Sequence, residues 1–274
     1  MSQRTMEAHY RPNWELTQAY GLLGYNCGYA KPDTTESFDD HQKSLVWQLL
    51  GDVIINPQST VLDVGCGIGG PAGWIFQKFH PSKLIGVEYL GSSVHAANER
   101  YRDKTEKPVF IQGDAHNLPM PDASVDVIFN LESALHYSDK DRFIGECRRV
   151  LKPTGTLCLG DITTSKKWLF APVMLMNKLP SQFNSNVHLW SVADYKTAFR
   201  KHDFELHRHE DVSLPVAKSI DDGIAEIKSR GWGSTKGFRG RIGFMAVLAM
   251  LLRRRLLGYD LFRAKPRAST RAGG

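Results

Sequence analysis

Two short segments of the chain carry residues whose types and spacing suit chemistry: a glycine cluster at residues 65–70 and a polar stretch at residues 130–137. The glycines come directly after an apolar segment, residues 60–64. They allow the backbone to turn sharply and to approach a ligand without a Cβ in the way. Pro71 can begin a helix there, and a helix start offers free N–H groups. Strand, glycine loop and helix together predict the binding of a nucleotide-like cofactor.

The glycine spacing fits two cofactor classes. Gly65, Gly67 and Gly70 satisfy the dinucleotide pattern G-x-G-x-x-G, whereas Gly65, Gly67 and Gly69 satisfy the tighter G-x-G-x-G of S-adenosylmethionine (SAM) enzymes. A second apolar segment ends in Glu88, about 20 residues further on, where a carboxylate accepts hydrogen bonds from ribose hydroxyls. Both classes use such an acid, so these residues alone leave the choice open.

Three further motifs follow in order. Residues 110–122 contain G-D-A-x-x-L-P, residues 124–130 form an apolar strand that begins with D-x-I, and residues 146–155 contain R-V-L-K-P-T-G. With these motifs the chain resembles the class I SAM-dependent methyltransferases over residues 60–162, with Thr154 in place of a glycine of the family. An NAD-type oxidoreductase is disfavoured because G-D-A-x-x-L-P has no role there. The resemblance implies an α/β, Rossmann-like fold with a seven-stranded, mostly parallel sheet, an antiparallel seventh strand and flanking helices.

The resemblance also implies that SAM is the cofactor and that it lies at the ends of the first four strands. Asp114 is expected to contact the adenine amino group, and the end of the fourth strand is expected to face the methionine part. Tyr10 precedes Gly28 and Tyr29 by the spacing of the tocopherol-type enzymes, in which an N-terminal tyrosine closes over the cofactor. The predicted cofactor-binding residues are Tyr10, Asp63, Gly65, Cys66, Gly67, Gly69, Glu88, Tyr89, Asp114, Ala115, Asn130 and Leu131.

The segment E-S-A-L-H-Y, residues 132–137, indicates particular groups within the methyltransferase class. It is similar to the erythromycin-type 3''-O-methyltransferases of macrolide sugars and, more distantly, to tocopherol, sterol and phenolic-glycolipid methyltransferases. Residues 25–32 also resemble the N-x-G-Y-W-K-P of the sugar O-methyltransferases, with Ala30 in place of the aromatic residue.

His136 is the predicted general base. An imidazole ordinarily titrates at about pH 6.5, so it can take a proton from a hydroxyl as the methyl group arrives. The alternative is a histidine that only orients the loop or the substrate. Glu132, the second predicted catalytic residue, either binds the amino group of the cofactor's methionine part or supports His136. Asp161, at the end of the fifth strand, could also reach a substrate; no second carboxylate stands at a spacing that would predict a metal site.

The net charge of +6 is unevenly distributed along the chain. Residues 230–274 contain eleven Lys or Arg and one acidic residue, whereas residues 1–229 contain 24 basic and 28 acidic residues. Such an end suits a solvated basic face, or peripheral contact with an anionic membrane or substrate. We expect no nucleic-acid partner, because no recognisable binding module accompanies the charge.

Cysteine usage and hydropathy predict a cytoplasmic protein. The four cysteines, at positions 27, 66, 147 and 158, form no C-x-x-C pair and are expected to be reduced and mostly buried. The longest apolar stretch, residues 244–252, is too short to span a bilayer. The N-terminal residues do not read as a secretory signal.

The domain organisation is expected to have four parts: an N-terminal helical cap at residues 1–45, a SAM-binding Rossmann-like core at 46–165, a substrate-side insertion with the closing strands at 166–267, and a flexible tail at 268–274. The sixth and seventh strands are expected at residues 204–213 and 258–265. Two apolar segments, residues 168–180 and 242–257, either cover the strand ends as an apolar substrate pocket or belong to the ordinary core.

These features predict a SAM-dependent methyltransferase that acts on a small-molecule natural product, apolar or glycosylated, by O-methylation with His136 as base. The alternative is C- or N-methylation of a lipid, prenyl or terpenoid acceptor. A SAM-binding protein without activity is a further alternative, against which the segment around His136 argues.

Overall fold

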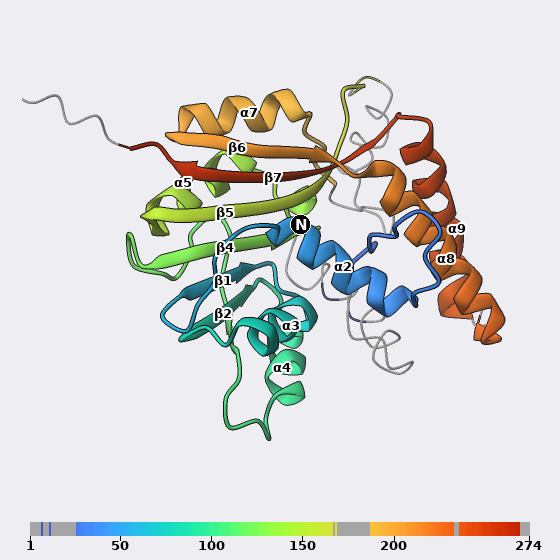
Figure 1. Ribbon diagram of the computed structural model, residues 1–274, viewed down its shortest axis with the longest axis horizontal. Helices are drawn as coiled ribbons and strands as arrows, with labels where there is room; N and C mark the ends of the chain where they lie inside the picture. The colour runs from blue at the N-terminus through green and yellow to red at the C-terminus, as the bar shows by residue number, and fades with distance from the viewer. Residues whose placement is uncertain are drawn as a thin grey trace, which may run out of the picture.

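The computed structural model describes residues 26–166, 187–232 and 236–268, together with residues 7, 11 and 168; of residues 236–238, 240 and 241 it describes the backbone alone. In this part of the chain, seven strands form one sheet in the order β3-β2-β1-β4-β5-β7-β6 (Figure 1). The strands are β1 (Thr60–Val64), β2 (Lys83–Glu88), β3 (Val109–Gln112), β4 (Val125–Leu131), β5 (Leu151–Thr163), β6 (Phe204–Asp211) and β7 (Gly258–Pro266).

The strand directions confirm the predicted fold class. Strands β1 to β5 pair in parallel, and β7 runs antiparallel to its neighbours β5 and β6. Parallel strands buried on both faces require apolar side chains on both, which explains near-continuous apolar runs such as Thr60–Val64. The sixth and seventh strands lie where the sequence predicted them.

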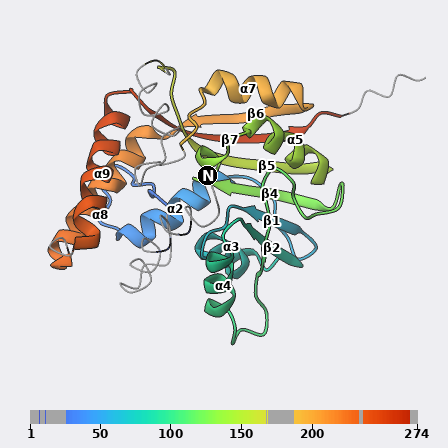
Figure 2. The ribbon, with the colours of Figure 1, turned by 180° about the vertical axis from the view of Figure 1, so that it is seen from behind.

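Helices cover both faces of the sheet (Figures 1 and 2). Because successive side chains of a strand point to opposite faces, Val61 and Leu62 enter different cores. The core of Val61 includes residues of α2 (Phe38–Leu50), α3 (Gly70–Phe79), α4 (Gly91–Arg100), α8 (Ser213–Ser229) and α9 (Lys236–Arg253). The core of Leu62 includes residues of α5 (Lys140–Val150) and α7 (Val192–Lys201).

Local capping explains where several of these helices begin. The side chains of Ser37 and Asp139 accept hydrogen bonds from N–H groups in the first turns of α2 and α5. Ser191 and Asp194 form a reciprocal capping box at the start of α7. Helix α3 begins directly after the glycine loop with Pro71 in its first turn, as the sequence predicted.

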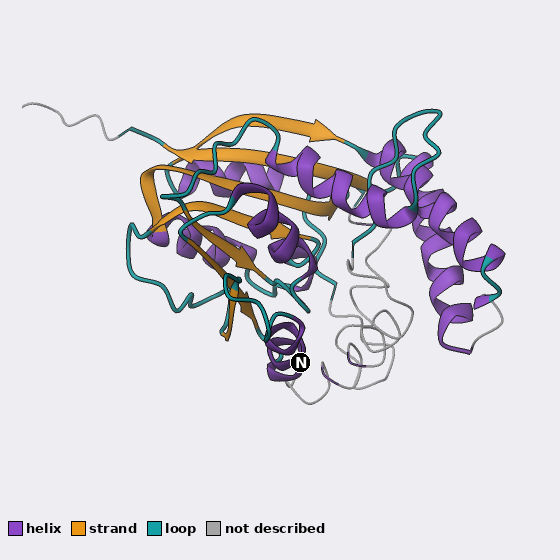
Figure 3. Cartoon of the chain, turned by 60° about the horizontal axis from the view of Figure 1, so that its bottom comes forward, coloured by secondary structure: helices purple, strands orange, loops and turns teal. Residues whose placement is uncertain are grey.

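Helices α8 and α9 pack side by side beyond one end of the sheet (Figure 1), and Figure 3 shows this helical pair extending away from the core. Leu248 and Leu252 of α9 are buried, whereas Phe244 and Val247 are exposed. No helix in the described part of the chain is long and apolar enough to cross a membrane.

Candidate active site

A cavity of about 350 Å³ lies at the carboxyl ends of β1 and of its two neighbours in the sheet, β2 and β4. The register pairs Val64 with Val87 of β2 and Asp63 with Phe129 of β4, so the ends of these three strands are neighbours. The strand order reverses between β1 and β4, and open α/β sheets bind ligands at such a switch point. The residues that follow β1, β2, β3 and β4 all contribute to the lining.

The glycine loop has the backbone that only glycine adopts readily. Gly65, Gly67 and Gly69 have positive φ angles of 73°, 54° and 77°. At Gly65 a Cβ would lie 2.4 Å from the side chain of Ser133, so the loop approaches the segment after β4 too closely for any side chain. Gly65 and Gly67 line the cavity together with Cys66, whereas Gly69 lies outside the lining and precedes α3.

Asp63 is the buried carboxylate at the end of β1. Its side chain is 2% exposed, and among the described residues Oδ2 has no hydrogen-bond partner. Burial, with the nearby charge of Glu88, raises the pKa of Asp63 to about 8. An unsatisfied buried oxygen is costly. This oxygen, which lines the cavity, therefore fits a ligand that brings a donor or a positive charge, such as the ammonium group of SAM.

Glu88, at the end of β2, is held by the backbone around the glycine loop. Its carboxylate accepts hydrogen bonds from the N–H groups of Gly67, at 3.1 Å, and Leu90, at 3.0 Å. Burial raises the pKa of this carboxyl group. A carboxylate has about four lone-pair positions, so these backbone contacts leave Glu88 able to accept a ribose hydroxyl. Tyr89, 40% exposed, lines the cavity next to it.

The G-D-A turn after β3 brings Asp114 and Ala115 to the same cavity. Asp114 accepts a hydrogen bond from the backbone N–H of His116 at 2.9 Å, and the ring Nδ1 of His116 lies 2.7 Å from the same oxygen. These contacts fix the carboxylate at the cavity wall while leaving its second oxygen available to a ligand.

Asn130 closes the end of β4 onto β1. Its side chain is fully buried, and its amide nitrogen lies 2.9 Å from the carbonyl of Val64 and 2.6 Å from the hydroxyl of Ser133. Asn130 lies outside the cavity lining, whereas Leu131 belongs to it. Asn130 thus stabilises the position of the segment after β4 relative to the end of β1.

Glu132 faces the cavity from a left-handed backbone conformation, with φ at 53°. Its carboxylate accepts hydrogen bonds from the backbone N–H of Cys27, at 2.7 Å, and from the hydroxyl of Tyr259, at 2.6 Å. Burial raises the pKa of this group. A buried carboxylate held by donors from two distant segments is a fixed acceptor that a reaction could use.

His136 ends a short 3₁₀ turn, Ala134–His136, and lines the cavity together with Glu132. Two backbone hydrogen bonds hold this turn. The N–H of His136 donates to the carbonyl of Ser133, and the N–H of His188 donates to the carbonyl of Leu135 at 2.7 Å. The structure thus brings both predicted catalytic residues to the cavity that most of the predicted cofactor-binding residues line.

Asp161 does not reach this cavity. Its carboxylate is fully buried and accepts hydrogen bonds from the ammonium group of Lys140, at 2.6 Å, and the hydroxyl of Tyr195. The expectation that Asp161 could contact a substrate is therefore not supported, because its carboxylate forms a buried ion pair with Lys140 at the start of α5.

Several lining residues were missed by the sequence analysis. Ser133 and Tyr137 stand inside the quoted E-S-A-L-H-Y segment and their hydroxyls lie 2.9 Å apart, so this segment held a signal for them. Asn26, in the N-C-G-Y segment, also lines the cavity. Tyr259 gives no local signal, because it reaches Glu132 from 127 residues away.

Four predictions lie wholly or largely outside the described residues: the closure of Tyr10 over the cofactor, the first 25 residues of the N-terminal cap, the apolar segment 168–180 apart from Trp168, and the tail after residue 268. In the described part of the chain, no cluster of three or more His, Cys, Asp or Glu could hold a metal ion. The four cysteines are buried.

Comparison with known proteins agrees with this geometry. Residues 62–159 match the methyltransferase domain family. Fold, cavity and match together define a class I, SAM-dependent methyltransferase domain, with SAM as its cofactor, as the motifs predicted.

The relatives are of the type that the motifs indicated. The chain is 31% identical over 203 residues to a sterol 24-C-methyltransferase of Gibberella zeae, covering 69% of this chain and 50% of that protein. It is 34% identical over 139 residues to the erythromycin 3''-O-methyltransferase of Saccharopolyspora erythraea, covering 50% and 45%. It thus spans about half the length of these curated relatives.

A solved structure extends the likeness in fold to almost the whole chain. The cyclopropane synthase MmaA2 of Mycobacterium tuberculosis superimposes with a TM-score of 0.78 at 17% identity, covering 97% of this chain and 98% of that one. At this identity the likeness concerns the fold alone, so the reaction must be argued from the site.

Proposed function

We propose that the protein transfers a methyl group from SAM to a hydroxyl group of a small-molecule natural product, with His136 as the base. The observation that carries this proposal is the shared cavity. Asp63, Glu88 and Asp114 line it from one side, and Glu132 and His136 line it from the segment after β4.

The residues of this cavity suit the demands of methyl transfer. When bound, SAM supplies an electrophilic methyl group, so the protein has to align the acceptor, exclude water and remove a proton. Phe129 and Leu131 contribute apolar walls at the end of β4. The imidazole of His136 would accept the hydroxyl proton of the acceptor, and the buried carboxylate of Glu132 would orient the acceptor or support the charge that develops on the imidazole.

A second candidate is C- or N-methylation of a lipid, prenyl or terpenoid acceptor. The fixed, buried carboxylate of Glu132 favours it, since an alkene acceptor needs its carbocation stabilised and then deprotonated. The similarity to a sterol C-methyltransferase supports the same reading. Phe244 and Val247 on α9 are exposed, as is Arg254 directly after this helix, and such residues would suit an acceptor with an apolar chain and an anionic head.

Incubation of the protein with metabolite extracts and SAM that carries a deuterated methyl group tests both candidates. Mass spectrometry of the products identifies the acceptor and the methylated atom. A labelled small molecule methylated on oxygen is the expected result, and labelling on carbon or nitrogen would select the second candidate. Label found only in protein or nucleic acid would overturn both.

A further inference from the structure

Residues 26–30, named here the strap, cross from the cavity to helix α8. On the cavity side, the N–H of Cys27 donates to Glu132 and Asn26 belongs to the lining. On the helix side, the hydroxyl of Ser219 donates to the carbonyl of Cys27 at 2.8 Å. The position of the strap therefore affects both the Glu132 carboxylate and the shape of the cavity.

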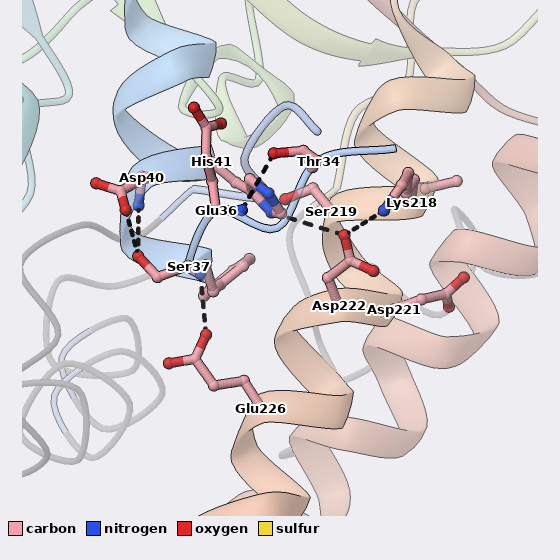
Figure 4. Close-up of polar contacts among 12 residues, drawn as sticks. Thr34, Glu36, Ser37, Asp40, His41, Lys218, Ser219, Asp221, Asp222 and Glu226 are labelled. Carbon is pink, nitrogen blue, oxygen red and sulfur yellow. Dashed lines mark hydrogen bonds and ion pairs between the residues drawn. The ribbon is translucent and has the colours of Figure 1, made fainter. Parts of the chain in front are cut away.

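His41, in the first turns of α2, lies under the strap. Its backbone carbonyl accepts the N–H of Tyr29 at 2.8 Å. A Cβ added at Gly28, where φ is 72°, would lie 3.0 Å from the Cβ of His41 and 2.3 Å from the hydroxyl oxygen of Ser219. The strap thus fits closely against His41 and Ser219, and Figure 4 shows these two side chains next to each other between α2 and α8.

The imidazole of His41 is fully buried and unsatisfied. Its exposed fraction is 0%, and among the described residues neither ring nitrogen has a hydrogen-bond partner. The nearest carboxylate oxygen, Oδ2 of Asp222, is 4.0 Å from Nδ1, which is too far for a hydrogen bond. Such a site tolerates a neutral imidazole far better than an imidazolium.

The charged groups around this ring come from two helices. Asp222 and Lys218 face it from α8 and pair with each other at 2.7 Å, so the ammonium group offsets part of the attraction between this carboxylate and a protonated ring. Glu36, just before α2, and Asp40, in its first turn, act on the ring only electrostatically, and Figure 4 shows the Asp40 carboxylate directed at Ser37. Burial is the largest influence and lowers the pKa of His41. Asp222 raises this pKa, Lys218 lowers it, and Glu36 and Asp40 raise it more weakly, so the net shift is downward.

We propose that His41 is a positioning residue that seats the strap over the cavity while it is neutral and releases the strap when it is protonated, so that acidification opens the cofactor site. A proton on a buried ring without acceptors cannot be stabilised in place, whereas displacement of the strap would expose the ring to water. The inference rests on the cofactor site and is independent of the methyl acceptor.

The direction of the pH effect follows from linkage. An exposed histidine binds its proton at about pH 6.5, and the seated form binds it only at lower pH. Between these two values the released form holds more protons, so seating weakens as the pH falls below about 6.5.

Hydrogen–deuterium exchange of the strap amides tests the proposal, with the parent protein compared with His41→Phe, which keeps bulk without a titratable group. At about pH 5.5, after correction for intrinsic rates, the parent strap should exchange up to about tenfold faster relative to neutral pH, and the variant should not. S-adenosylhomocysteine affinity should show the same difference. Because both proteins contain Asp63 and Glu88, the pH dependence of those carboxylates cancels in the comparison.

Equal pH dependence in the parent and the variant would overturn the proposal. If His41→Phe fails to fold, His41→Leu and Asp222→Asn replace it. Asp222→Asn removes a group that favours the imidazolium, so the acid-induced exchange of the strap should deepen below about pH 6; an unchanged profile would equally overturn the proposal. If the parent does not bind S-adenosylhomocysteine at neutral pH, that result would instead contradict the cofactor site.

Discussion

Glu132 and His136 stand four residues apart on a segment whose backbone is unusual. A non-glycine residue with positive φ is uncommon and costs about 1–3 kcal/mol, so the surrounding contacts must hold it. At Glu132 these contacts are the Cys27 N–H and the Tyr259 hydroxyl. Glu132, the residue with the strained backbone, is therefore also a residue that lines the cavity.

Replacing His136 with Ala should separate catalysis from cofactor binding. Turnover should fall by roughly 10² to 10⁴, the usual effect of removing a positioned base. The affinity for S-adenosylhomocysteine should stay within a few-fold, because Asp63 and Glu88 remain in place. Initial rates and calorimetry measure the two effects. Near-parental turnover in His136→Ala would show that the acceptor needs no base from this residue, and would shift attention to Glu132.

Asp63 should make cofactor binding depend on pH. A carboxylate with a pKa of about 8 is largely protonated at neutral pH in the free protein. Binding of an ammonium group requires its ionised form, so affinity for S-adenosylhomocysteine should rise by up to about tenfold per pH unit toward pH 8 and then level off. Calorimetry should find weaker and flatter binding in Asp63→Asn. A parental affinity independent of pH would argue against contact between Asp63 and the amino group.

At the scale of elements, the glycine loop and the start of α5 fix the two sides of the cavity. The glycine loop needs left-handed backbone, and at Gly65 it also needs the absence of a side chain. The ion pair of Lys140 and Asp161 anchors α5, which begins four residues after His136, onto β5.

Gly65→Ala and Gly67→Ala form a matched pair for the loop. Both replace a glycine of positive φ, at a cost of about 1 kcal/mol for the backbone. At Gly67 a Cβ meets nothing within 4 Å, whereas at Gly65 it meets Ser133. The free energy of unfolding should therefore fall further in Gly65→Ala than in Gly67→Ala. Equal losses in urea denaturation would show that backbone conformation alone limits this loop.

Breaking the buried ion pair should destabilise the fold. Lys140→Met leaves the Asp161 carboxylate charged and buried, which costs about 3–5 kcal/mol, whereas Lys140→Met with Asp161→Leu should lose less. Lys201→Met, which removes an exposed lysine from its pair with Asp141, is the control and should change stability by less than about 1 kcal/mol. Urea denaturation measures all three. A double variant less stable than Lys140→Met would contradict this account.

At the scale of the whole molecule, the last strand completes both the sheet and the site. Strand β7 is inserted between β5 and β6, and it carries Tyr259, which donates to Glu132. Arg263 on the same strand pairs with Asp52 and Glu210, so it ties the end of α2 to β6.

Truncation should show how far the fold depends on this strand. A chain that ends at Leu257 lacks β7, which leaves β5 and β6 without their shared neighbour and opens the core around Phe262. We expect it to lose cooperative thermal unfolding. A chain that ends at Ala268 keeps β7 and should unfold as the full chain does. Cooperative unfolding of the shorter chain would show that β7 is dispensable for the core.

The sequence alone determined the features that depend on neighbouring residues. Glycines between an apolar strand and a proline-led helix, an acid at the end of β2 and the G-D-A turn specified the fold class, the cofactor and a part of the cavity lining. Each of these signals lies within a few residues of the structure it specifies, so local backbone preference and strand order suffice to read it.

Only the tertiary structure decided which polar groups meet across the fold. Cys27 reaches Glu132 over 105 residues, Lys140 removes Asp161 from the site, and the strap buries His41 against α8. In the sequence, Glu132, Asp161 and His41 look equally available for chemistry. Burial and the nearest partner decide their charge and their access to a ligand, and both arise from the packing of elements that are distant along the chain.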